Sequence, residues 1–166
     1  MKILCLPTLI SFLKNKHLLL DTNILRDAAN KPAVFNHFFN ELKKSDVTFA
    51  TIDVVKYELL KGSVDSVKYK AREKHINDII DVIIPCVPKT FDLVYELIQS
   101  YGIDGSALNV TDLLLGATLM QYGSNICLIT RDTTDFMQKI FDLPFVVNAT
   151  HEKGIFTYGI YQYNSP

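Results

Sequence analysis

Four acidic residues stand where a parallel α/β sheet would gather them at one edge. Asp21 and Asp132 each follow a predicted buried strand. Asp112 lies in the first turn of a predicted helix, and Glu58 lies within two turns of the start of another. Right-handed crossovers start each helix at the carboxyl edge of the preceding strand, and open α/β sheets bind ligands in the crevice at that edge. We therefore expect the four carboxylates to point into one crevice.

Crowded carboxylates need a counter-charge. They repel one another and raise one another's pKa, so an uncompensated cluster holds protons near neutral pH. Oxygen ligands without a suitably spaced His or Cys favour Mg²⁺ or Mn²⁺ over zinc. Such an ion lowers the pKa of bound water and neutralises the charge that builds on a phosphodiester. The expected chemistry is phosphodiester hydrolysis without a protein nucleophile, with the neighbouring Asn23, Thr22 and Thr130 orienting the ligands or water.

Each acid also has an ordinary interpretation, and only the set favours a metal site. Asp21 is a common turn residue, Asp112 suits a helix dipole, and Glu58 has lysines nearby, as a surface acid does. Arg131 suits either a phosphate contact or a solvated loop. A stripe of basic residues could contact phosphate, although a solvated helix with i,i+4 pairs is the favoured interpretation. The basic residues are Lys56, Lys61, Lys68, Lys70, Arg72 and Lys74.

The whole chain fits one soluble globular domain. It has 166 residues, 48% of them hydrophobic, and a formal net charge of -1. Its three cysteines form no CxxC pair, which favours a reducing, cytoplasmic setting without structural zinc. The apolar run 3–12 is broken by Pro7, lacks a clear cleavage site and is too short to span a bilayer. We expect residues 1–16 to be an extension packed on a single domain at 17–166, with a secretory signal as the weaker alternative.

Alternating apolar strands and amphipathic helices predict a mostly parallel sheet covered on both faces. Strands are expected at 18–20, 47–50, 83–87, 126–130 and 145–148, and helices at 32–44, about 53–61, 64–82, 91–101 and 111–122. Thr51 or Asp53 is the predicted cap of the second helix and Thr111 that of the last, while 102–106 is a predicted turn. The aromatic tail suits core or edge packing better than a partner-binding surface; it contains Phe156, Tyr158, Tyr161 and Tyr163.

Four segments carry a resemblance to a known family. They are 19–25 (LLDTNIL), 57–62 (YELLKG), 111–117 (TDLLLGA) and 128–136 (LITRDTTDF). In this order they resemble the motifs of PIN-domain nucleases, particularly VapC-type toxins and stand-alone relatives, over roughly residues 18–147. The resemblance implies a three-layer α/β/α PIN-like fold. It also implies that Asp21, Glu58 and Asp112 are metal-site acids, with Asp132 as the fourth acid and Asp135 as its rival.

The resemblance implies a function as well. We expect an endoribonuclease that depends on Mg²⁺ or Mn²⁺, cuts RNA, forms a homodimer, has no membrane association and, if it is a toxin, binds an antitoxin protein. The sequence departs from the family pattern at 1–16 and 64–82, which leaves toxin status open. The alternative is a non-catalytic PIN-like module that binds RNA or protein. A metal-dependent phosphatase ranks third, because 21–23 (DTN) lacks the second Asp two residues on that haloacid-dehalogenase-like phosphatases use.

Overall fold

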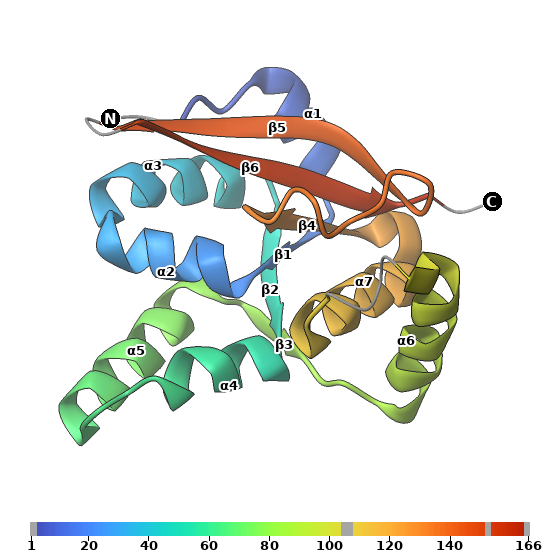
Figure 1. Ribbon diagram of the computed structural model, residues 1–166. Coiled ribbons are helices and arrows are strands. Elements are labelled where there is room, and N and C mark those ends of the chain that lie inside the picture. Colours follow the sequence, from blue (N-terminus) through green and yellow to red (C-terminus); the bar gives the residue numbers. More distant parts are fainter. Residues whose placement is uncertain (1–2, 104–107, 152–153, 165–166) are drawn as a thin grey trace.

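The computed structural model describes residues 3–103, 108–151 and 154–164, and its centre is a six-stranded sheet (Figure 1). The strand order is β3-β2-β1-β4-β6-β5. The strands are β1 (His17–Leu20), β2 (Thr48–Ile52), β3 (Val82–Ile84), β4 (Ile126–Thr130), β5 (Phe141–His151) and β6 (Gly154–Tyr163). Strands β1 to β4 pair in parallel, whereas β6 runs antiparallel to β4 and β5. The predicted mixed α/β fold with a mostly parallel sheet is confirmed.

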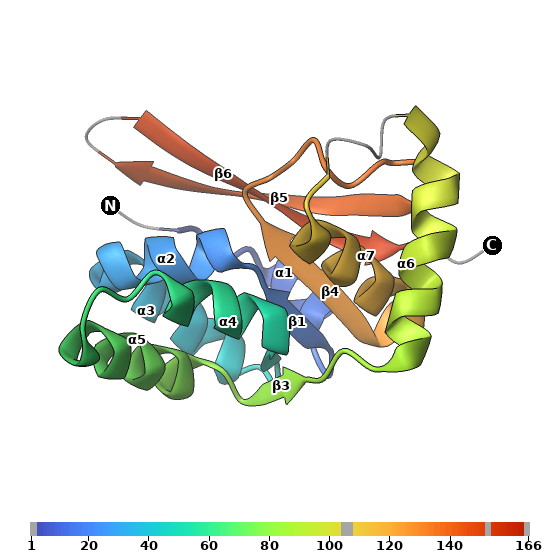
Figure 2. The ribbon, with the colours of Figure 1, turned by 60° about the horizontal axis from the view of Figure 1, so that its bottom comes forward.

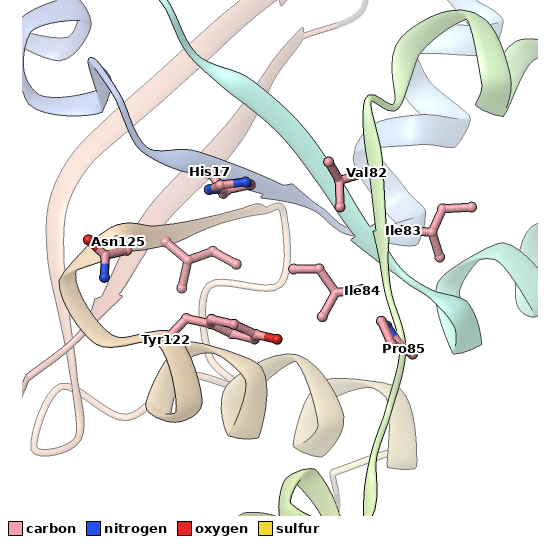
Figure 3. A pocket seen from close by; sticks show the side chains of 8 residues that line it. His17, Val82, Ile83, Ile84, Pro85, Tyr122 and Asn125 are labelled. Carbon is pink, nitrogen blue, oxygen red and sulfur yellow. The ribbon is translucent and has the colours of Figure 1, made fainter.

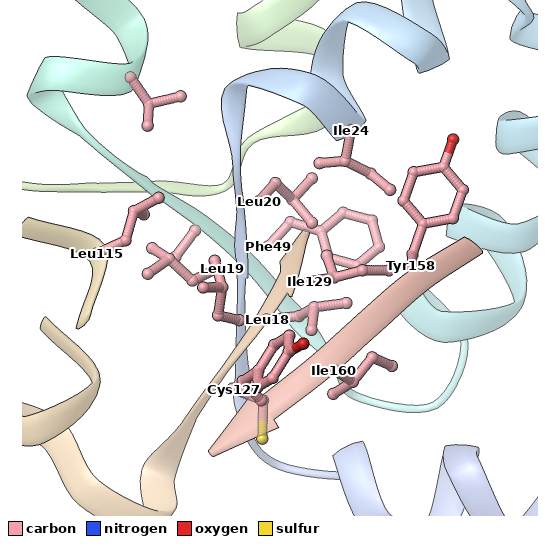
Figure 4. Packing of buried hydrophobic residues seen from close by; sticks show 14 of the residues in the cluster. Leu18, Leu19, Leu20, Ile24, Phe49, Leu115, Cys127, Ile129, Tyr158 and Ile160 are labelled. Carbon is pink, nitrogen blue, oxygen red and sulfur yellow. The ribbon is translucent and has the colours of Figure 1, made fainter. Parts of the chain in front are cut away.

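The centre of the sheet is apolar on both faces. Leu18 to Leu20 in β1 and Cys127 to Ile129 in β4 have no exposed surface (Figure 4). Strands of a parallel sheet covered on both sides read as continuous apolar runs, which is why both strands were recognisable in the sequence. Leu20 pairs with Ile129, so the two strands end level with each other. That register brings the residues after β1 and β4 side by side.

Helices cover the sheet from both sides. Figure 1 shows α2 (Thr22–Asn30) and α3 (Pro32–Lys43) on one side, and α6 (Pro88–Tyr101) and α7 (Val110–Tyr122) on the other. In Figure 2, α4 (Asp53–Lys61) and α5 (Ser66–Ile79) lie on the α2 side, and α2 packs against both α3 and α4. Near the amino terminus, α1 (Pro7–Leu13) buries Leu9 and Leu13. Among the described residues, no helix combines the length and apolar character needed to cross a bilayer.

The last two strands differ most from the sequence-based expectation. The strand predicted at 145–148 is the middle of an eleven-residue strand, β5, which forms a hairpin with β6. β6 lies between β4 and β5, so the tail is not an edge strand. The core interpretation is confirmed for Tyr158 and Tyr161, which are fully buried. Glycine is required at position 159, because a Cβ there would collide with the Tyr161 ring.

Two predicted helix caps are wrong. Ile52 is the N-cap of α4, and Thr51 instead donates its hydroxyl to the carbonyl of Leu20 at 2.9 Å. Asn109 is the N-cap of α7, where its side chain accepts from the backbone N–H of Asp112 at 2.9 Å. Thr111 is thereby free to serve another group. The predicted turn at 102–106 falls largely outside the described residues.

Candidate metal centre

Three of the four predicted acids meet at the carboxyl edge of the sheet. Asp21 follows β1 and caps α2, Asp112 lies in the first turn of α7, and Asp132 follows β4. One carboxylate oxygen from each lies within 4.8 Å of the other two. Asp21 and Asp112 are buried, whereas Asp132 is exposed, so the group opens to solvent on the Asp132 side. The register of β1 and β4 and the start of α7 produce this convergence.

Hydrogen bonds fix Asp21 from within the protein. The backbone N–H of Thr22 donates to Oδ1 at 2.5 Å, and the hydroxyl of Thr130 donates to Oδ2 at 2.7 Å. Burial nevertheless raises the pKa of Asp21 to about 6; the hydrogen bonds from Thr130 and Thr22 oppose the shift, and the charges of Asp132 and Glu58 add to it. The carboxyl group is held in place but is costly to ionise without a counter-charge.

Asn23 links the two strand ends. Its Nδ2 lies 2.7 Å from Asp21 Oδ2 and 3.0 Å from Asp132 Oδ2, so one amide group spaces two acids. Its Oδ1 accepts from the backbone N–H of Arg131 at 3.1 Å. Thr130 acts beside it, because its hydroxyl oxygen accepts from the backbone N–H of Asp132 at 3.1 Å. Asn23 and Thr130 therefore contact Asp21 and Asp132 from the protein side.

Asp112 has the strongest electrostatic conflict of the group. Burial raises its pKa to about 7, and the negative charges of Asp21, Asp135, Asp132 and Glu58 contribute in that order. The conflict is the one that a divalent cation relieves. The donors are oxygens only, which fits Mg²⁺ or Mn²⁺.

Glu58 lies beside the group of three rather than within it. It lines the same cavity of about 140 Å³, together with Asp21, Thr22, Asn23, Arg26, Asn109, Thr111, Asp112 and Asp132. Its Oε2 accepts from the hydroxyl of Thr22 at 2.7 Å, and its Oε1 accepts from that of Thr111 at 2.5 Å. Glu58 thus holds the starts of α2 and α7 toward each other. No sequence signal pointed to Thr111 in this role, because a threonine near the start of a helix is an ordinary cap residue.

Asp135, the predicted rival of Asp132, points elsewhere. Its Oδ1 accepts from the hydroxyl of Thr134 at 3.0 Å, and its backbone oxygen accepts from the hydroxyl of Tyr101 at 2.6 Å. It raises the pKa of Asp112 from a distance but does not belong to the group of three among the described residues. Geometry favours Asp132 as the acid contributed by this motif.

Basic residues around the cavity take different roles. Arg26 is exposed on α2 and lines the cavity. Arg131 is exposed and forms an ion pair with Asp27 at 3.0 Å. In the lysine-bearing helix α5, Lys74 pairs with Asp78 at 2.6 Å with i,i+4 spacing, in keeping with the favoured interpretation of a solvated helix.

An apolar cavity of about 280 Å³ lies at the opposite end of the central strands. Figure 3 shows it between β3 and the end of α7, with His17 at the start of β1 and Tyr122 facing the side chains of Val82 and Ile84. Ile126, the first residue of β4, also lines it. Because the acids follow the ends of β1 and β4, this cavity is separate from the candidate metal centre.

Comparison with known proteins supports the fold. No protein-family model matches the sequence, and no curated protein matches it. A solved structure, the crystal structure of VapBC2 from Rickettsia felis bound to a DNA fragment from their promoter, contains a similar chain with 26% sequence identity and a TM-score of 0.51. The similarity covers 61% of the present chain and 78% of that chain. The protein therefore has a PIN-like α/β fold, distantly similar to a chain of the VapBC2 complex, with a cluster of acidic residues at the carboxyl edge of its sheet.

Proposed function

We propose that the protein is a divalent-metal-dependent endoribonuclease of the PIN type. The observation that carries the proposal is the convergence of Asp21, Asp112 and Asp132 within 4.8 Å, in a buried setting that raises the pKa of two of them. Two buried carboxylates that are costly to ionise, Asp21 and Asp112, serve no purpose in a scaffold. They become favourable when a cation is present, and the similarity to a VapBC2 chain points to the same class of protein.

The residues present fit Mg²⁺ or Mn²⁺. Asp21, Asp112 and Asp132 would hold the ion, with Glu58 adding negative charge at the cavity wall. When bound, such an ion supplies a water of lowered pKa and neutralises charge on the phosphate. The protein's own contribution is placement: Asn23 sets the separation of Asp21 and Asp132, while Thr22 and Thr111 orient Glu58.

Arg26 gives the cavity a cation for the substrate. It lies one turn beyond Asn23 on α2, lines a cavity whose acids are otherwise unbalanced, and is exposed. A guanidinium suits a phosphate because its donors match phosphate oxygens in pairs. We propose that Arg26 binds the RNA phosphate next to the scissile bond.

The partners follow from the same similarity. We propose a small antitoxin protein that binds over the acidic crevice, a homodimer, and action in the cytoplasm. Size measurement of the purified protein, alone and after co-expression with proteins encoded beside it, tests the dimer and the antitoxin. A lone monomer under both conditions contradicts both partner assignments.

The function is tested by incubating a mixed RNA pool with wild-type protein and Asp21→Asn. Asparagine is as good an N-cap as aspartate, so the variant keeps α2 while losing one charge. Asp78→Asn, on exposed α5, is the matched control. We expect Mn²⁺ or Mg²⁺ to support cleavage by wild type and control, chelator to abolish it, and Asp21→Asn to lose at least about a hundredfold in rate.

Cleavage that persists in chelator, or that Asp21→Asn retains, contradicts the mechanism. Calorimetric titration with Mn²⁺ distinguishes the metal-dependent nuclease from the remaining alternative. A folded wild-type protein that takes up no Mn²⁺ and cuts no RNA would be a non-catalytic PIN-like module.

A further inference from the structure

A polar cluster with two buried members lies next to the loop that carries Asp132. It consists of Asp27 on α2, Arg131 after β4 and Tyr158 on β6. Asp27 Oδ2 accepts from the hydroxyl of Tyr158 at 2.8 Å and from Arg131 Nη1 at 3.0 Å, and Arg131 Nη1 also lies 3.4 Å from Oδ1. Asp27 is 9% exposed and Tyr158 is fully buried. None of the three side chains lines the acidic cavity.

The cluster is more than a solvated ion pair. The Arg131 guanidinium also lies over the Phe156 ring, 5.3 Å from its centroid, so its plane is held from two directions. The Tyr158 ring packs edge-on against Phe35, with ring centroids 5.8 Å apart. The Asp27 carboxylate is therefore bound by Tyr158 on the side of the core and holds Arg131 on its other side. A planar guanidinium held by both a carboxylate and an aromatic ring loses little further side-chain entropy when it is fixed.

Helix α2 holds the Asp132 loop at two points. Asn23 and Asp27 are four residues apart, so they lie on one face of the helix. Asn23 binds the backbone N–H of Arg131 and the carboxylate of Asp132, and Asp27 binds the side chain of Arg131. Asp132 itself is exposed, and its site contacts are those with Asn23 and Thr130. Asp132, the exposed member of the three acids, therefore depends on the adjacent Arg131 for its position.

We infer that Asp27 is a positioning residue for the metal site: through Arg131, and backed by Tyr158, it holds Asp132 in place for the cation. This inference rests on the proposed function for the presence of the ion. Its structural core, that Asp27 orders the 130–132 loop, is independent of any activity. The expected effect on metal affinity is about tenfold, the lower end of what outer-shell partners of metal ligands contribute.

The experiment compares Asp27→Asn with a matched control, Asp81→Asn. Asp81 also accepts from one basic side chain, Lys43 at 2.8 Å, and from a second donor, the backbone N–H of Phe49 at 2.8 Å, but it lies away from the acidic cavity. Hydrogen exchange of the Arg131 and Asp132 amides is measured in metal-free protein by NMR, with β1 amides reporting global unfolding. Mn²⁺ affinity is then measured by calorimetry.

We expect Asp27→Asn to speed exchange at Arg131 and Asp132 at least about tenfold relative to β1 amides, and to weaken Mn²⁺ binding about tenfold, whereas Asp81→Asn changes neither ratio. If Asp27→Asn does not fold, Arg131→Ala removes the same contact from its exposed side and carries the test. Unchanged local exchange in the folded variant overturns the inference. Faster exchange in a protein whose wild type takes up no Mn²⁺ supports the positioning role and contradicts the proposed function, so the two failures are distinguishable.

Discussion

Replacing Asp112 by Asn should stabilise the metal-free protein while it abolishes metal binding. Asp112 is 5% exposed, and its pKa is raised from 3.8 to about 7 by burial and by neighbouring carboxylates, Asp21 first. One pKa unit corresponds to about 1.4 kcal/mol. At pH 8 the cost of ionising this group in the folded protein is therefore about 4 kcal/mol. Asparagine keeps the shape, and the backbone N–H that Asn109 caps is retained.

The pH dependence has a definite sign. Between about pH 4 and pH 7 the folded protein retains a proton on Asp112 that the unfolded chain has released. The free energy of unfolding therefore falls as pH rises through this window. From pH 5 to pH 8 the contribution of Asp112 is a loss of roughly 2–3 kcal/mol. Asp21, with a pKa of about 6, adds a fall of the same sign that remains in the variant.

Urea unfolding with chelator at pH 5 and pH 8 measures the effect. Asp112→Asn should be more stable than wild type at pH 8 and should show a smaller fall with pH. Asp78→Asn, an exposed surface control, should shift stability by about 0.5 kcal/mol or less at both pH values. Mn²⁺ at about a hundred times its Kd should then stabilise wild type by about 2.7 kcal/mol and leave Asp112→Asn unchanged. A variant that is less stable than wild type at pH 8, with the same pH dependence, refutes the reasoning.

Three further predictions test separate parts of the site. Thr111→Val removes the hydroxyl that binds Glu58 and should weaken Mn²⁺ binding about tenfold in calorimetry, while an unchanged affinity would show that Glu58 needs no such support. Arg26→Ala should raise KM for RNA about tenfold at constant kcat, with partial recovery in Arg26→Lys; a fall in kcat alone contradicts a substrate contact. Asn109→Ala and Asp65→Ala each remove a helix cap and should each cost about 1 kcal/mol in urea unfolding, but only Asn109→Ala should weaken Mn²⁺ binding, because only its helix carries Asp112.

The sequence was sufficient to locate the central strands and the acids beside them. Residues 18–20 and 126–130 are apolar throughout, as doubly covered strands are, and an acid after such a strand falls at the carboxyl edge. The convergence of Asp21, Asp112 and Asp132 followed from topology rules that apply to any parallel sheet. Fold class and the position of the acidic cluster were therefore predictable without coordinates.

Contacts set by tertiary packing were not predictable. Thr111 has the sequence position of a cap, and only the approach of α4 to α7 turns its hydroxyl to Glu58. Asp27 looks like a surface residue of α2 until β6 places Tyr158 against it, 131 residues later in the chain. The position of β6 between β4 and β5 depends on pairing energies that no local pattern reports. These residues support the candidate site without bearing a motif.

The insertion of β4 between β1 and β6 has a consequence for how the protein is made. Asp21 and Asp132 follow two strands, β1 and β4, that pair directly but are separated by more than a hundred positions along the chain. Such distant pairings form slowly because the intervening chain must close a large loop. A growing polypeptide that had not yet reached β4 would expose Asp21, Glu58 and Asp112 without the partner strand of β1. The acidic cluster is therefore incomplete until β4 has been made and has paired with β1.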